Sequence, residues 1–425
     1  MITYAYPPLN RIASSRIYSW AKYWGQGGHD ITVLTTEKSS ADGILNYTPK
    51  SIEARLSELK YRRKNYVPTK PFANNHGKGN KGFYSRVLRI LSVIREKYLP
   101  MQMFHKLGMV PPGLARANKL LDHRAFDTVV STFDPFACHI IASMLKNNHK
   151  FFWLADYRDL LTGNNFQEDS NVIRCLERHS EKFFLRRADL ISTVSDPLRR
   201  KLEILHAKPV VTIENGFDPE EFDGLNDIFF PVDDKIRIVH TGTFYPLKQD
   251  PTPLFEAIRE LKYENYQNMN RLSIHVFGNK CDLIGKLAQE YNTDEFVAVH
   301  GLIERELSHR IQKEADALLF LDWTDVRQQG IITSKIYEYV FAHTPILSIG
   351  TDFASISNDF IKKTGTGFLL GRSVPKIKKV LKKLLDHEKL PTAPNVELIN
   401  NFHKKRLANK LLAEIFSRID QSAKV

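Results

Sequence analysis

One stretch decides how the fold of this chain is interpreted: Gly330-Ile331-Ile332-Thr333-Ser334-Lys335-Ile336-Tyr337-Glu338-Tyr339-Val340-Phe341-Ala342-His343-Thr344-Pro345-Ile346-Leu347. A polar loop ends in Lys335, a helical pattern carries Glu338 one turn later, and an apolar strand follows. The free N–H groups and partial positive charge of a helix N-terminus suit a phosphate, and Lys335 adds a full charge. Glu338 lies four residues after Ser334, whereas a capping box requires a spacing of three, so capping does not account for Glu338. Its carboxylate can instead accept hydrogen bonds from sugar hydroxyls. The pattern therefore predicts a site for a diphosphate joined to ribose, as in a nucleotide-sugar; a plain surface helix is the alternative.

The composition is that of a globular protein with more than one domain. The 425 residues are 42% hydrophobic and 26% charged, and this length favours two or three domains. No run of about 18 apolar residues predicts a transmembrane helix, and the first turns of the chain lack the apolar core of a signal peptide. Cys138, Cys175 and Cys281 are odd in number and widely spaced, which fits neither a zinc site nor a disulfide framework. We therefore expect a reducing, cytoplasmic location.

The positive charge is concentrated in one segment. Residues 50–119 contain 16 Lys and Arg against three acidic residues, which equals the net charge of +13 of the whole chain. Within this segment, Phe83–Leu99 has the pattern of an amphipathic basic helix beside a loop rich in lysine and glycine. Such a surface favours an anionic partner, namely phospholipid, a polyphosphate carrier or nucleic acid. The alternative is a helix that packs on its own domain and exposes a solvated charged face.

Short apolar strands alternate with longer helical patterns, which is typical of α/β units on parallel sheets. In the first half, strands are expected at Ile2–Tyr6, Ile31–Thr35, Thr128–Thr132, Phe151–Ala155, Leu190–Val194 and Val210–Ile213, and helices at Arg16–Trp24 and Ile173–Arg187. In the second half, strands are expected at Ile236–Thr241, Leu272–Phe277, Phe296–His300, Ala317–Leu321, Ile346–Ile349 and Gly367–Leu370. The stretch Asn215–Val232, rich in Asp, Pro and Phe, separates the halves. The pattern predicts an α/β protein with two Rossmann-like domains facing a cleft.

Five motifs in order resemble those of glycosyltransferases with the GT-B fold, in particular the family-four type that transfers sugars from nucleotide donors with retention of configuration. They are Tyr6-Pro7-Pro8 with Arg16 and Gly28–Thr35, then Asp156-Tyr157-Arg158-Asp159, Ala188–Ser195, Glu214–Asp218 and Thr241–Tyr245. The resemblance covers nearly the whole chain. It departs in two places. The glycine pair of the first loop is here Ala13-Ser14-Ser15, and the first Glu of the family's paired-Glu signature is Gly330, whereas Glu338 fits the second.

The resemblance implies an order of domains and a set of donor-binding residues. An acceptor-side domain would span residues 1–220 with a basic insert at about 50–120, a donor-binding domain 221–400, and a helix within 401–425 would pack back on the first domain. The donor-binding residues would be Gly242, Thr243, Lys248, Gly330, Ile331, Ile332, Lys335 and Glu338. Lys248 stands where the family carries a basic residue facing the diphosphate, and the backbone of Gly330–Ile332 would replace the missing glutamate. Solvated surface lysines are the alternative for Lys248 and Lys335.

Polar side chains after two strands of the first half are assigned to the acceptor side and to catalysis. The acceptor-side residues are Ser15, Arg16, Asp134, His139, Arg158 and Asp159, and the catalytic ones Lys248, Lys335, His139 and Asp156. Charge builds on the leaving β-phosphate as the sugar C1–O bond breaks, so fixed positive groups beside it are the efficient catalyst. No metal or other cofactor is expected. A structural histidine is the alternative for His139, and a loop-stabilising Arg–Asp pair for Arg158.

Taken with the resemblance, these observations predict a glycosyltransferase that is cytoplasmic and peripheral to the inner face of the cell membrane. It would move a sugar from a nucleotide-sugar to a lipid-linked or surface-glycan acceptor, and dock on anionic membrane through the basic 50–120 segment; nucleic acid is not an expected partner. Two alternatives remain: a GT-B nucleotide-sugar epimerase, and a catalytically silent GT-B scaffold that binds anionic lipid or nucleic acid. Gly330 favours the silent scaffold, whereas Lys248, Lys335 and Glu338 oppose it.

Overall fold

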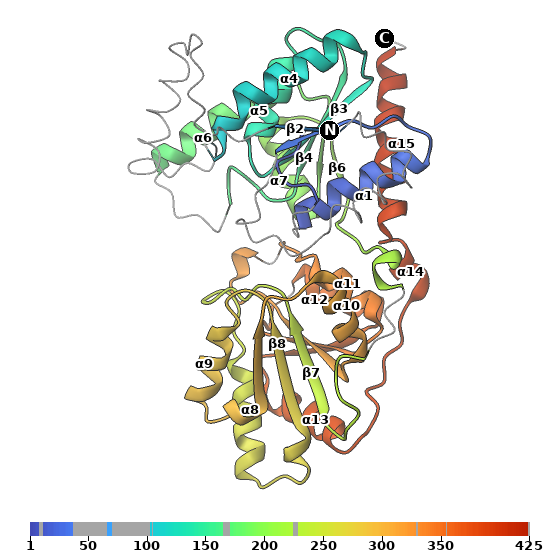
Figure 1. Cartoon of the computed structure of the whole chain (residues 1–425). Coiled ribbons are helices and arrows are strands. Elements are labelled where there is room, and N and C mark those ends of the chain that lie inside the picture. The colour runs from blue at the N-terminus through green and yellow to red at the C-terminus, as the bar shows by residue number, and fades with distance from the viewer. Residues whose placement is uncertain are drawn as a thin grey trace, which may run out of the picture. The chain divides into compact units, whose positions relative to one another are not determined.

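A computed structural model describes residues 1–7, 12–36, 66–69, 103, 105–164, 171–223, 228–328, 330–353 and 355–423. By its internal contacts the chain divides into two units: an N-terminal unit of residues 1–214 with 405–425, and a C-terminal unit of residues 215–404. Each is an α/β unit built on parallel strands (Figure 1).

The C-terminal unit is built on a six-stranded sheet in the order β12-β11-β10-β7-β8-β9, in which every pair is parallel. The strands are β7 (Ile236–Thr241), β8 (Leu272–Phe277), β9 (Val297–Gly301), β10 (Ala317–Leu321), β11 (Ile346–Ile349) and β12 (Gly367–Gly371). From β7 the chain first extends the sheet on one side, to β8 and β9, and then returns to the other side of β7 with β10. The direction of strand order therefore changes between β7 and β10, which makes that pair the topological switch point.

Helices cover both faces of this sheet because its strands are apolar on both faces. They are α8 (Thr252–Tyr263), α9 (Asp282–Glu290), α10 (Arg305–Glu314), α11 (Lys335–Ala342), α12 (Ile356–Thr364), α13 (Val374–Leu385) and α14 (Val396–Asn400). Helices α8, α9 and α13 bury apolar side chains against Ile238 and Leu319 on one face. Helices α10, α11 and α12 do so against Val239 and Leu318 on the other. Neighbouring residues of one strand thus belong to two different cores.

The N-terminal unit has a four-stranded parallel sheet in the order β3-β4-β5-β6, extended by the pair β1-β2. The strands are β1 (Val33–Thr36), β2 (Tyr66–Thr69), β3 (Thr128–Phe133), β4 (Phe152–Tyr157), β5 (Leu190–Thr193) and β6 (Val210–Thr212). The first residues of the chain join the two parts. Ile2 N donates to Val130 O at 2.7 Å, while Leu34 N donates to Met1 O at 2.8 Å, so this segment lies between β1 and β3.

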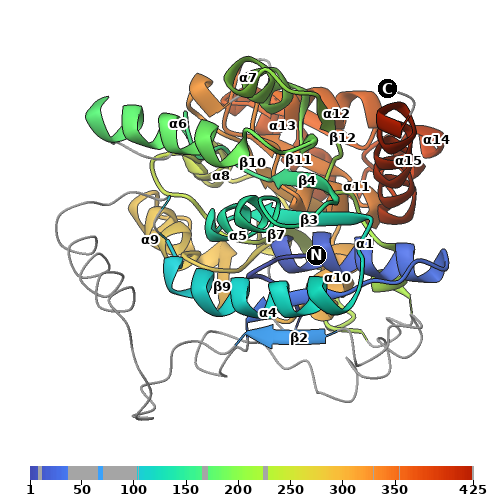
Figure 2. The same cartoon turned by 90° about the horizontal axis from the view of Figure 1, so that it is seen from above.

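The helices of the N-terminal unit also form two layers. They are α1 (Ile12–Gln26), α4 (Val110–His123), α5 (Ala137–Leu145), α6 (Asn171–Leu185), α7 (Asp196–His206) and the last helix, α15 (Lys404–Ala423). Helices α4 to α7 pack on one face of the sheet. Helices α1 and α15 lie side by side on the other face (Figure 2). There Leu411 of α15 is buried with Trp20 of α1, and Trp24 Nε1 donates to Ala408 O at 2.8 Å.

The predicted fold class is confirmed, including the last helix that returns to the first unit. Most predicted strands agree with observed ones to within one or two residues. The exception is the predicted strand Ile2–Tyr6, which is reduced to a bridge at Ile2 because the chain bends at Tyr4 and Pro7 has no N–H to donate. The predicted basic helix Phe83–Leu99 lies outside the described residues, as does most of the 50–120 segment.

Candidate functional site

The loop after β7 and the start of α11 meet at the switch point of the C-terminal sheet. Thr241, the last residue of β7, is fixed to α11 by Tyr339, whose hydroxyl accepts from Thr241 N at 2.8 Å. Gln312 of α10 donates to Thr241 Oγ1 at 2.9 Å. These buried bonds place the N-terminus of α11 beside the glycine turn that follows β7. Ligands of open α/β sheets bind outside the carboxyl ends of the strands at such a point.

Gly242 and Lys335 are in direct contact there. A Cβ added to Gly242 would lie 3.1 Å from Lys335 Cε and 3.2 Å from Lys335 Nζ, and the φ of Gly242 is 116°. The backbone conformation therefore favours glycine at this position, and a Cβ there would also push against the end of the Lys335 side chain. The next turn is tighter still, because a Cβ on Gly278 would lie 2.0 Å from the Gly242 carbonyl oxygen. The sequence-predicted residues Gly242 and Lys335 thus form one site.

His240 orients the Lys335 ammonium. His240 Nδ1 lies 2.9 Å from Leu319 O, which can only accept, so Nδ1 carries the proton and Nε2 is an acceptor. Lys335 Nζ lies 3.4 Å from that Nε2. Burial and the neighbouring Lys335 charge hold the pKa of His240 well below its usual value, and burial lowers the pKa of Lys335 to about 8. His240 was not among the predicted site residues, although a histidine at the end of an apolar strand, just before Thr241-Gly242, was a signal in the sequence.

The first turn of α11 presents two hydroxyl groups that have no hydrogen-bond partner within the described part of the chain. Ser334 is the N-cap residue, but its side chain makes no capping bond, and its Oγ is buried without a partner. Thr333 Oγ1 is buried without a partner as well. Buried polar groups are almost always paired, so two orphaned donors beside a lysine and a helix N-terminus indicate a place for an anion.

Glu338 is one turn further along α11 and already has a strong partner. Its Oε1 accepts from Arg305 Nη2 at 2.7 Å, and its Oε2 lies 3.6 Å from His309 Nε2. Burial alone would raise the pKa of Glu338, but the charge of Arg305, helped by His309, lowers it to about 2. The carboxylate is therefore ionised and fixed in direction. Arg305 and His309, both on α10, were not predicted as site residues.

The other predicted donor residues are spread around the same loops. Lys248 is half-buried in the loop after β7, where its carbonyl accepts from Thr324 N at 2.9 Å, and its charge contributes after Arg327 to the lowered pKa of Asp325. Thr243 follows Gly242 and is half-buried. In the other loop, Ile331 O accepts from Trp323 Nε1 at 2.9 Å. The side chain of Ile332 belongs to the apolar core beneath α11, and Gly330 precedes this pair.

In the N-terminal unit, Arg16 and Asp156 form a buried ion pair. Arg16 Nη2 lies 2.9 Å from Asp156 Oδ1 and Arg16 Nε 3.2 Å from Oδ2, and the two side chains are 2% and 0% exposed. Thr132 and Ser192 donate to the same carboxylate, and Arg16 Nη1 donates to the carbonyls of Ile213 and Glu214. This pair fastens α1 to the ends of β3, β4, β5 and β6. Ser15 is half-buried one residue earlier on α1.

His139 is enclosed by the apolar core of α5. It is fully buried, its Nδ1 lies 2.7 Å from Ser131 Oγ, and its ring packs 4.9 Å from that of Tyr157. Burial lowers the pKa of His139 to about 3, so the ring is neutral. This position favours a structural role, since contact with an acceptor would require α5 to move.

A more accessible polar group lies where β3 and β4 end. His105 Nδ1 is 3.3 Å from Asp134 Oδ1, and each side chain is 37% exposed. Arg158 Nη2 donates to Asp134 O at 3.2 Å, and its neighbour Asp159 is exposed. The structure thus brings Asp134 and Arg158 together and adds His105, which sequence reasoning missed because it lies in the unassigned basic segment.

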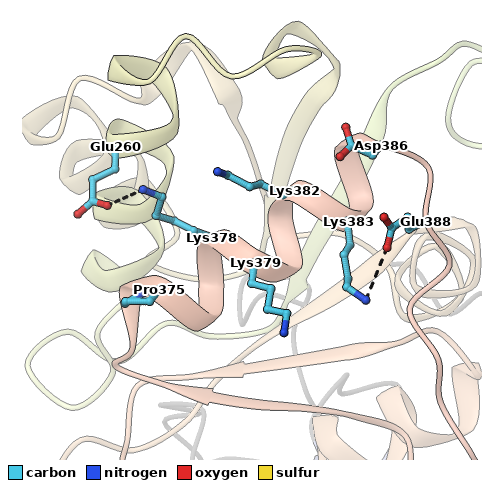
Figure 3. A pocket seen from close by; sticks show the side chains of 8 residues that line it. All are labelled: Glu260, Pro375, Lys378, Lys379, Lys382, Lys383, Asp386 and Glu388. Atoms are coloured by element: carbon cyan, nitrogen blue, oxygen red, sulfur yellow. Dashed lines mark hydrogen bonds and ion pairs between the residues drawn. The ribbon is translucent and has the colours of Figure 1, made fainter.

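A hollow of about 430 Å³ lies on the surface of the C-terminal unit, between α13 and α8. Figure 3 shows Lys378 directed at Glu260 and Lys383 at Glu388 along its wall, at 2.8 and 3.6 Å. Such exposed pairs are typical of a solvated charged face. The hollow contains none of the predicted site residues.

Comparisons with known proteins give a structural likeness only. No family model and no curated protein sequence matches this chain. Sucrose-phosphate synthase from Thermosynechococcus elongatus superposes with a TM-score of 0.59 at 13% identity, over 96% of this chain and 93% of its own. The lipopolysaccharide outer core galactosyltransferase WaaB gives 0.56 at 13% identity, over 98% of both chains. A protein assigned as a UDP-N-acetylglucosamine 2-epimerase from Listeria monocytogenes gives 0.52 at 13% identity, over 99% and 96%.

At these identities the likeness shows the fold, and the fold is GT-B. The structural neighbours with this fold include glycosyltransferases and epimerases. Among the residues described here, no helix is long and apolar enough to cross a membrane.

Proposed function

We propose that this protein is a glycosyltransferase that uses a nucleotide-sugar donor, of the retaining family-four type. The observation that carries the proposal is the contact of Lys335 with Gly242 at the switch point, beside the orphaned hydroxyls of Thr333 and Ser334. A lysine, a helix N-terminus and a glycine turn together form a cradle for a diphosphate. Glu338, one turn away and ionised, is placed to accept hydrogen bonds from the ribose.

The chemistry follows from where charge develops. As the bond between sugar C1 and the β-phosphate oxygen breaks, negative charge grows on that phosphate, and Lys335 with the N–H groups of α11 stabilises it. The acceptor oxygen forms its bond to C1 on the face that the phosphate leaves, and the acceptor proton passes to the leaving phosphate oxygen. We keep Lys248 as a second basic group for the diphosphate. No step in this scheme draws on a cofactor.

We assign acceptor binding to the N-terminal unit, at the end of β3 and β4. Asp134 and His105 can orient a hydroxyl group, and Arg158 can bind an anionic part of a lipid-linked or glycan acceptor. The buried Arg16–Asp156 pair is given a positioning role here, because its polar atoms already have partners within the fold.

Binding of nucleoside diphosphates tests the donor site. We expect one of UDP, GDP, ADP or CDP to raise the unfolding temperature by mass action. Glu338→Ala should weaken that binding by tenfold to a hundredfold, since a charged hydrogen bond contributes about 1.5–3 kcal/mol. Lys376→Met, an exposed change on α13, serves as control and should leave affinity unchanged.

The result also separates the alternatives. A silent scaffold would bind none of the nucleotides, and equal affinity in Glu338→Ala would remove Glu338 from the site. An epimerase is the second candidate because such enzymes are among the structural neighbours. Incubation with a bound nucleotide-sugar in the absence of any acceptor distinguishes the two, since only an epimerase would convert the sugar.

The charge distribution supports a peripheral membrane location on the cytoplasmic face. The segment of residues 50–119 carries the whole net charge of +13. Each basic residue near an anionic leaflet contributes on the order of 1 kcal/mol, and salt screens the attraction. We therefore expect sedimentation with vesicles of anionic lipid at low salt, and little with neutral lipid or at high salt. Equal binding to both vesicle types would contradict the proposal, and preference for RNA or DNA would support the nucleic-acid alternative.

A further inference from the structure

Arg305 binds two carboxylates that come from distant parts of the chain. Its Nη2 lies 2.7 Å from Glu338 Oε1 and 2.8 Å from Glu221 Oε2, and its Nε donates to Glu221 Oε2 at 3.0 Å. The three side chains are only 13–20% exposed. One guanidinium group therefore fixes the direction of both carboxylates in a poorly solvated place, where such bonds are strong.

The second carboxylate belongs to the segment through which the chain enters the C-terminal unit. Glu221 is in a short 3-10 turn, Pro219–Phe222, just after the border at residue 215. Its Oε1 lies 3.2 Å from Nζ of Lys404, the last residue of that unit, and Lys404 N donates to Phe217 O at 2.8 Å. The entering and leaving segments are thus joined to each other and, through Arg305, to Glu338.

The charges of this cluster balance. Two carboxylates face the cations of Arg305 and Lys404, and Phe222 stacks on the His309 ring at 4.1 Å. Loss of Arg305 would leave Glu221 and Glu338 buried near each other, with the remaining cation, Lys404, in contact with Glu221. Glu338 would then turn toward solvent or toward His309, because an unpaired buried carboxylate is costly.

We propose that Arg305 is a positioning residue of the donor site: it holds the Glu338 carboxylate in the direction that receives the ribose hydroxyls, and through Glu221 it ties that direction to the segments that enter and leave the C-terminal unit. The inference rests on the proposed function, since it takes Glu338 as the ribose acceptor. Arg305 itself touches no part of the substrate.

The test compares ribose recognition in the wild type and two variants, using one nucleoside diphosphate and its two deoxy forms. The nucleoside diphosphate that binds best to the wild-type chain is measured by calorimetry against its 2′-deoxy and 3′-deoxy forms. In the wild type, loss of the hydroxyl that contacts Glu338 should weaken binding about tenfold. In Arg305→Met the natural ligand should bind about as weakly as the deoxy ligand binds to the wild type. The deoxy penalty, which is the factor by which removal of the hydroxyl weakens binding, should fall below about threefold. Lys313→Met, on the same helix α10, removes a charge that contacts Phe222 instead and should keep the full penalty.

Each outcome decides something different. A full deoxy penalty in Arg305→Met would overturn the positioning role even if the variant were less stable, because a purely structural residue affects both ligands equally. If Arg305→Met does not fold, Arg305→Lys makes the same comparison. A single ammonium cannot bridge both carboxylates as the guanidinium does, so a reduced penalty is expected and an unchanged one overturns the inference. A wild-type chain that binds no nucleotide would overturn the proposed function itself, and this inference with it.

Discussion

Lys335 is the residue on which the proposed donor site depends most. It is surrounded by groups that do not neutralise it: a histidine held in its neutral form, a glycine, and the buried thiol of Cys281, whose pKa burial raises to about 11. The ammonium therefore has no carboxylate in contact with it among the described residues. A cation prepared in this way gains its strongest partner when an anion arrives.

The first prediction concerns the pH dependence of nucleotide binding. The pKa of Lys335 is lowered to about 8 in the free protein, and a bound diphosphate favours the protonated form. Affinity should stay nearly constant from about pH 7 to 8, where the terminal phosphate is already ionised, and fall by up to about tenfold per unit above pH 8. Titration calorimetry from pH 7 to 9 measures this.

Two variants show whether Lys335 causes the pH dependence of nucleotide affinity. Lys335→Met should bind more weakly and lose the decline, whereas Lys376→Met should keep it. The same decline in Lys335→Met would mean that another group, such as Lys248, carries the charge that the diphosphate meets.

At the scale of elements, the packing of α10 against α11 should be sensitive to acid. Burial alone would raise the pKa of both Glu338 and Glu221, but Arg305 and other neighbouring groups together lower each pKa by more than burial raises it. The pKa of Glu338 falls from its usual 4.5 to about 2, and that of Glu221 falls further. Groups with a lowered pKa stabilise the fold above their unfolded pKa and lose this contribution as pH falls through the folded one. Between pH 4.5 and 2, Glu338 alone should remove on the order of 3 kcal/mol from the free energy of unfolding.

Urea unfolding of the wild type and of Glu338→Gln at pH 7 and at pH 3 checks this second prediction. The glutamine variant should be less stable at pH 7 and lose less stability on acidification. Parallel curves for the two proteins would show that Glu338 is not the group that titrates.

The sequence allows the elements to be predicted better than the contacts between them. Strands such as Ile236–Thr241 and Ala317–Leu321 are short apolar runs with clear ends, so local pattern suffices to place them. The first strand fails because the chain bends at Tyr4, so that only a bridge at Ile2 to β1 and β3 remains.

In the candidate site, too, local signals in the sequence were easier to predict from than contacts between elements. Gly242, Lys335 and Glu338 could be proposed from the sequence because their loops carry local signals, a glycine turn and a helix start. Arg305 was missed because nothing local marks it: it resembles any surface residue of a charged helix. His240 was missed because its one local signal, its place just before Thr241-Gly242, does not show what its ring contacts. Their roles appear only when β10 places Leu319 O against His240, and α10 places Arg305 against Glu338.

At the scale of the whole molecule, the two units differ in how the chain builds them. The C-terminal unit is one continuous stretch, residues 215–404, whereas the N-terminal unit needs residues 405–425 to complete it. Those last residues supply Leu407, Ala408, Leu411 and Ile415 to the core that also holds Ile17, Trp20 and Trp24 of α1. The N-terminal unit can therefore reach its full core only after the last helix has been made.

Separate expression of the units gives the third prediction. Residues 215–404 alone should fold cooperatively, because both cores of that unit lie within the stretch. Residues 1–214 alone should aggregate, because Trp20 and Trp24, which are at most 4% exposed in the whole chain, would lose the cover of α15. Joining residues 405–425 to them through a flexible linker should restore solubility. In the intact protein, Leu411→Ala should cost about 2–5 kcal/mol, as expected for a fully buried leucine, whereas Asn409→Ala, an exposed change on the same helix, should cost little. A soluble, cooperatively unfolding 1–214 fragment would show instead that α15 only covers a unit that is already stable without it.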